Sequence, residues 1–97
     1  MIEHIVLFKW SGNAEDSVKD LIARELRKLP DQIEEIMELS CGRDISGGSK
    51  GYDFALIARF QDRDTLEGYL SHPAHQSLVE TLVRPNTEDI LAFDYIH

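Results

Sequence analysis

Apolar and polar side chains alternate along the first ten residues, a pattern typical of a β-strand. We expect this strand over residues 2–10. One face of the strand holds Ile2, His4, Val6, Phe8 and Trp10, and the other holds Glu3, Ile5, Leu7 and Lys9. Both faces carry large apolar residues, which is typical of strands in sheets that are covered on both sides.

A helical repeat replaces the alternation after the turn residues 11–13. Its apolar stripe recurs every three or four positions and consists of Val18, Leu21, Ile22, Leu26 and Leu29. The repeat predicts a helix over residues 14–29, with Asn13 as its N-cap and Pro30 as the residue that ends it.

Three later segments are predicted to be strands, over residues 36–45, 52–60 and 89–96. In the first of them, one face carries Met37, Leu39, Cys41 and Ile45. The glycine- and serine-rich segment 46–51 lacks the spacing and the following helix of a phosphate-binding loop. We therefore expect it to be a mobile connection between two strands.

Two short helical repeats, separated by Pro73, lie between the last two predicted strands. Asp62 is placed to cap the first repeat, which carries Leu66, Tyr69 and Leu70. Proline suits the first turn of a helix, so Pro73 is expected to begin the second one. The apolar side of that second helix consists of Leu78, Val79, Leu82 and Val83.

The predicted order of elements is strand, helix, strand, strand, helix pair, strand, which is the ferredoxin-like arrangement. Right-handed crossovers place the helices on one face of a four-stranded antiparallel sheet, giving an α+β fold in a single domain over residues 1–97. The other face then has no cover from this chain. We therefore expect a homodimer in which two sheets pack face to face and form a dimeric α/β barrel.

Charge and cysteine content narrow the classes of function. The 97 residues include 18 acidic and 10 basic ones, for a net charge of −8, and no basic stripe that could follow a phosphate backbone. Nucleic acid is therefore not an expected partner. A membrane is not expected either, because no segment approaches about 20 apolar residues. Cys41 is the only cysteine, so no internal disulfide can form, and we expect a cytoplasmic location.

Four segments together resemble the stress-responsive dimeric α/β-barrel (Dabb) family. They are the strand residues 4–9, the segment Gly51 to Leu56, the stretch Tyr69 to His75 with its His-Pro-Ala-His sequence, and Phe93 to Tyr95. The His-Pro-Ala-His stretch after a tyrosine is the most specific of these. The resemblance covers the whole chain and implies the same fold and dimer.

The resemblance also implies a possible chemistry. The family includes boiling-stable plant proteins and a polyketide cyclase that uses histidines and a tyrosine without a metal or an organic cofactor. Its first-strand histidine matches His4, its helical tyrosine matches Tyr69, and the second histidine of its His-Pro-Ala-His stretch matches His75. These three residues are the candidate catalytic residues of a small-molecule site that needs no cofactor.

Two of the candidate residues, and His72 beside them, also have a structural interpretation. His4 and Tyr69 could be packed core residues with satisfied polar atoms, and His72 could cap the second helix. No carboxylate stands at a metal-ligand spacing among the histidines, so no metal site is expected. The chain could therefore be a non-catalytic stress-related or scaffold protein. A monooxygenase or an isomerase is a further alternative, by analogy of fold alone. A cavity of at least about 300 Å³ lined by His4, Tyr69 and His75 would favour a ligand.

Overall fold

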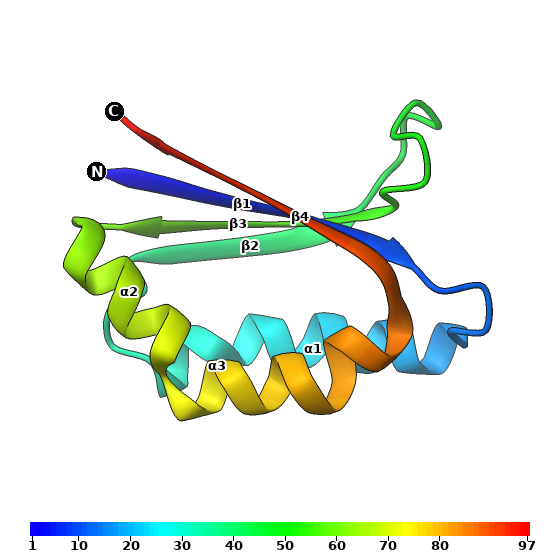
Figure 1. The fold of residues 1–97 in the computed structure, drawn as a ribbon, viewed down its shortest axis with the longest axis horizontal. Coiled ribbons are helices and arrows are strands. Elements are labelled where there is room, and N and C mark those ends of the chain that lie inside the picture. Colours follow the sequence, from blue (N-terminus) through cyan, green and yellow to red (C-terminus); the bar gives the residue numbers. More distant parts are fainter.

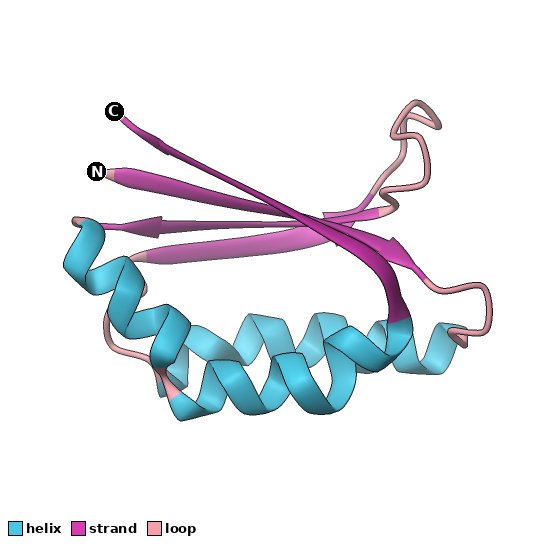
Figure 2. Cartoon of the chain, in the orientation of Figure 1, coloured by secondary structure: helices cyan, strands magenta, loops and turns pink.

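The computed structural model describes all residues from 1 to 97, and its sheet and helices form two layers (Figure 1). The sheet has four antiparallel strands in the order β2-β3-β1-β4. The strands are β1 (Ile2–Trp10), β2 (Glu38–Arg43), β3 (Phe54–Phe60) and β4 (Thr87–Ile96). All helices cover the same face of this sheet, which confirms the predicted ferredoxin-like fold (Figure 2).

The helical layer consists of α1 (Asp16–Gln32), α2 (Arg63–Ser71) and α3 (Pro73–Leu78). A π-helical turn, η1 (Val79–Val83), and a 3₁₀ turn, η2 (Arg84–Asn86), continue α3 and lead into β4. The break at Pro73 is confirmed. Asp62 caps α2 as expected, because its carboxylate accepts the Thr65 backbone N–H at 2.9 Å.

The alternation of β1 is confirmed by burial. Ile2, His4 and Phe8 point toward the helices and are at most 5% exposed. Ile2 and Phe8 belong to a core of 16 buried apolar residues that lies between the sheet and the helices. The opposite face of the sheet has no cover in the single chain.

The first helix begins and ends later than predicted. Glu15, without a side-chain cap, occupies the N-cap position, because the Asn13 side chain instead accepts a hydrogen bond from Ser11 Oγ at 2.8 Å. Pro30 lies inside the helix and does not end it. The chain keeps its helical path there because Leu29 and Ile33, on either side of Pro30, are fully buried, and the Ile33 N–H still bonds to the Leu29 carbonyl at 2.8 Å.

The second strand is shorter than predicted and leaves Ile45 98% exposed. Asp44 explains the early end, since its carboxylate accepts hydrogen bonds from Ser46 Oγ and from the Gly47 N–H, which turns the chain into the following loop. Two other strands begin at different residues than predicted. The strand β3 begins at Phe54 and not at residue 52, and β4 begins at Thr87 and not at residue 89.

Candidate functional site

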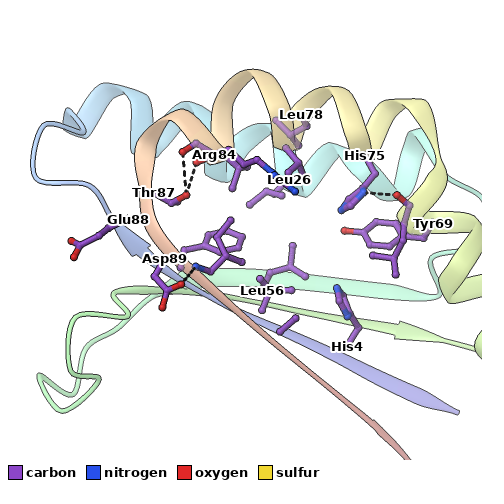
Figure 3. Close-up of a pocket in the computed structure, with 17 residues that line it drawn as sticks. His4, Leu26, Leu56, Tyr69, His75, Leu78, Arg84, Thr87, Glu88 and Asp89 are labelled. Carbon is purple, nitrogen blue, oxygen red and sulfur yellow. Dashed lines mark hydrogen bonds between the residues drawn. The ribbon is translucent and has the colours of Figure 1, made fainter.

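A cavity of about 520 Å³ lies between the sheet and the helical layer. It exceeds the size of about 300 Å³ that favours a ligand over a filled core. Of its 17 lining residues, 11 are hydrophobic, so only a few polar groups face its interior. His4, Tyr69 and His75 are among these polar groups, and Figure 3 shows His4 rising from the sheet opposite the other two.

His4 is fixed by a residue on the neighbouring strand. It stands opposite Asp94 in the pairing of β1 with β4, and its Nδ1 lies 2.5 Å from Asp94 Oδ1. The Asp94 carboxylate can only accept a hydrogen bond, so Nδ1 of the imidazole carries the proton. This arrangement leaves His4 Nε2 as the free ring nitrogen, on a side chain that is only 6% exposed.

Tyr69 is the central aromatic residue of the site. Its ring centroid lies 4.4 Å from that of His75 and 5.9 Å from that of His4. The residue is 2% exposed, and burial raises the pKa of its phenol well above the usual value. The phenol is therefore protonated at neutral pH, and its hydroxyl points into the cavity (Figure 3).

His75 reaches the cavity because the chain breaks at Pro73 and starts a new helix. Its Nδ1 lies 3.1 Å from the Leu70 carbonyl oxygen, and a carbonyl accepts, so Nδ1 donates this hydrogen bond. Burial, more than any neighbouring charge, lowers the pKa of His75. The neutral ring then presents an unprotonated Nε2.

His72 serves the backbone, as expected. Its Nδ1 accepts the Ala74 N–H at 3.0 Å and caps α3. Cys41 is half-buried against the core, and burial raises the pKa of its thiol, which opposes a role as a nucleophile. No group of three or more histidine, cysteine, aspartate or glutamate side chains is arranged to hold a metal ion.

Asp94 and Arg84 belong to the surroundings of the site but were not selected from the sequence. Asp94 could have been found by pairing the first and last predicted strands of a ferredoxin-like sheet. Arg84, on the cavity wall, follows the π-helical turn η1, which no sequence pattern indicated. Thr87, Glu88 and Asp89 line the same cavity where β4 begins.

The outer face of the sheet is strongly apolar. Ile57, Leu91, Phe93 and Tyr95 project from it with exposed fractions between 45% and 62%. An exposed apolar patch of this kind on a small protein marks an interaction surface. None of the helices has the length and the apolar composition that a membrane span requires.

A two-layer ferredoxin-like fold with an apolar outer sheet face and a cavity under its helices defines the α/β-barrel class. The chain belongs to the stress responsive A/B barrel domain (Dabb) family, whose model matches residues 2–97. An uncharacterized protein of Streptomyces coelicolor is 42% identical over 79 residues, which cover 79% of this chain and 81% of that protein. Olivetolic acid cyclase of Cannabis sativa is 24% identical over 97% of this chain and 94% of the cyclase.

Solved structures show the same fold. A dimeric ferredoxin-like protein of unknown function from Thermobifida fusca has a TM-score of 0.88 and 28% identity, over 99% of this chain and 90% of that one. A hydroxynitrile lyase from Passiflora edulis has a TM-score of 0.89 with 19% identity, over 99% and 92% of the two chains, and shows likeness of fold alone. The fold of this chain is thus shared with the hydroxynitrile lyase.

Proposed function

We propose that the chain binds a small organic molecule with a carbonyl group, of polyketide-like character, and acts on it by acid–base chemistry without a cofactor. The observation that carries this proposal is the convergence of His4, Tyr69 and His75 in one largely apolar cavity of about 520 Å³. Apolar cavities of this size with a few converging polar groups are typical of ligand sites.

His75 is the proton acceptor in this proposal. Its Nδ1–H is held by the Leu70 carbonyl, and its Nε2 carries a lone pair at neutral pH because burial lowers its pKa. When Nε2 takes a proton from the carbon next to the carbonyl, the electron pair of the C–H bond moves onto the carbonyl oxygen and forms an enolate.

Tyr69 and His4 act on the oxygen side of the same substrate. The protonated phenol of Tyr69 donates a hydrogen bond to the developing enolate oxygen, which stabilises its negative charge. His4, oriented by Asp94, exchanges a proton with the substrate through its free Nε2. Asp94 is a positioning residue here, because it touches His4 and not the substrate.

The working form in this proposal is a homodimer joined through the outer face of the sheet. The exposed apolar residues on that face need a cover, and the sheet of a second copy can supply one by face-to-face packing. The dimeric ferredoxin-like relative from Thermobifida fusca supports this assembly.

Two relatives support the chemical part of the proposal. Olivetolic acid cyclase is an enzyme, and its sequence is similar to this chain over nearly the whole length of both. The hydroxynitrile lyase shows that an enzyme can be built on the same fold.

A thermal-shift screen with aromatic polyketides, phenols and β-keto acids tests the proposal, because a bound ligand raises the melting temperature by mass action. We expect His75→Ala to abolish the ligand response while lowering the stability of the free protein by only about 1 kcal/mol. The matched control is His97→Ala, which removes a half-exposed histidine that does not line the cavity.

The competing candidate is a non-catalytic stress-related or scaffold protein. The observation in its favour is that His4 is nearly buried and already satisfied by Asp94, as in an ordinary core. In that case His4→Ala and His75→Ala would each lower the melting temperature and leave every ligand response unchanged. That result would refute the enzymatic proposal.

A further inference from the structure

Arg84 is a cation without an ionic partner on the wall of the cavity. Its guanidinium makes no salt bridge and no side-chain hydrogen bond within the chain. Of the 17 lining residues, only His4, His75 and Arg84 have nitrogen in their side chains. Arg84 is therefore the one permanently charged donor on this wall, with its donors free for a ligand.

The backbone explains why Arg84 is on the cavity side. The Arg84 N–H bonds to the carbonyl of Val79, five residues back, and closes a π-helical turn. In an α-helix of 3.6 residues per turn, residue 84 would lie about 140° around the axis from residue 79. The wider turn brings residue 84 closer to the side of the helix that carries Val79, and Val79 lines the cavity.

The acidic residues near Arg84 are turned elsewhere. Figure 3 shows the Arg84 side chain reaching into the cavity, whereas the carboxylates of Glu88 and Asp89 point away from it. Asp89 is also engaged, since it accepts a hydrogen bond from the Tyr52 hydroxyl at 2.6 Å. Arg84 is exposed, and no contacting carboxylate neutralises its charge.

We infer that the cavity takes an elongated ligand with a carboxylate group, which Arg84 holds at one end while the other end reaches Tyr69 and His75. This inference rests on the proposed function and adds the chemical class of the ligand to it. His75 and Arg84 are nine residues apart in the helical layer, which puts their α-carbons at most about 13 Å apart, and the Arg84 side chain extends into the cavity. A ligand that meets both side chains has to bridge two turns of this layer, which suits an elongated molecule. The apolar wall between them suits a hydrocarbon body.

A carboxylate fits this site better than a phosphate. The planar guanidinium pairs with a carboxylate through two parallel hydrogen bonds. A phosphate would bring up to two negative charges to a single cation, next to Glu88 and Asp89 at the rim. The net charge of −8 of the chain also disfavours a dianion.

Two probes that differ in one group test the inference. They are 4-pentylphenol and 5-(4-hydroxyphenyl)pentanoate, which share the phenol and the alkyl chain and differ by a terminal methyl or carboxylate. Calorimetric titration of the full chain at neutral pH is expected to show that 5-(4-hydroxyphenyl)pentanoate binds about tenfold more tightly than 4-pentylphenol. Arg84→Gln should remove this preference and leave the binding of 4-pentylphenol unchanged.

Arg24→Gln is the matched control, since Arg24 is exposed, makes no salt bridge and does not line the cavity. It should keep the preference for the acid. Equal affinity of the two probes for the wild-type chain, or a preference that survives Arg84→Gln, would overturn the inference and leave the proposed function standing if 4-pentylphenol binds. If neither probe binds the wild-type chain, the inference and the proposed function both fail.

Discussion

Replacing Phe93 by aspartate puts a carboxylate on the apolar outer face of the sheet. In the single chain Phe93 is 62% exposed, so the charge stays hydrated and the fold accommodates it. In the proposed homodimer the partner sheet covers this position, and an unpaired buried carboxylate costs several kcal/mol. Because about 1.4 kcal/mol corresponds to a factor of ten in a dissociation constant, we expect the dimer to weaken by about a hundredfold or more.

Light scattering coupled to size-exclusion chromatography measures this change across a micromolar concentration series. Ile45→Asp is the control, because it makes the same kind of change at a residue that is 98% exposed in the loop after β2. Circular dichroism checks that each variant keeps its fold. A wild-type chain that is monomeric throughout, or a Phe93→Asp variant that dimerises as tightly as the wild type, would refute the reasoning.

Ile5→Asp extends the test to the central strand β1, where the residue is already half-buried in the single chain. There the carboxylate should both dissociate the dimer and destabilise the fold. The contrast matters because Phe93→Asp separates assembly from folding, whereas Ile5→Asp does not. A loss of the dimer at both positions with loss of fold at only one locates the contact on the outer face.

Three further predictions concern single residues. Asp62→Ala should lower the melting temperature by a few degrees in a thermal scan, because it removes the capping box of α2; an unchanged melting temperature would contradict this. Asp94→Asn should change the tautomer of the His4 ring, which nitrogen chemical shifts of the imidazole report. If these shifts still show a proton on Nδ1, Asp94 does not position the ring. His75 should make stability pH-dependent: burial lowers its pKa in the folded state, so the unfolded chain takes up the proton first and stability falls as the pH drops below about 6.5. Urea unfolding at several pH values should show a flatter dependence for His75→Gln, and equal slopes would contradict the prediction.

The layers of this fold could be predicted from the sequence because they depend on periodicity. Alternation in β1 assigned Ile2 and Phe8 to the helix side, and the structure buries both. Periodicity of this kind reports which face is apolar, and the position of the core follows from it.

Element ends were less predictable because they depend on competition between local preferences and packing. Pro30 should end a helix by local rules, yet the burial of Leu29 and Ile33 keeps the chain helical past it. Ile45 was assigned to an apolar strand face, but the hydrogen bonds of Asp44 turn the chain away first. In the first case packing prevailed, and in the second a polar side chain did.

The site was predictable in part, and the missing residues have a common cause. The three ring-bearing residues could be selected by resemblance, and the structure brings them to one cavity. Asp94 required knowledge of which strands are neighbours. Prediction of Arg84 would have required knowledge of the π-helical turn, which changes the direction in which a residue faces without changing the pattern of apolar positions.

Burial is the main cause of the difference between the roles proposed for Tyr69 and His75. Removal of water disfavours the charged form of every group, so it raises the pKa of an acid such as the phenol and lowers the pKa of a base such as the imidazole. One physical cause thus leaves the phenol as a hydrogen-bond donor and the imidazole as a proton acceptor, with their rings 4.4 Å apart. A change that admits water to the cavity should then weaken both roles together, because the two pKa values would return toward their ordinary values from opposite directions.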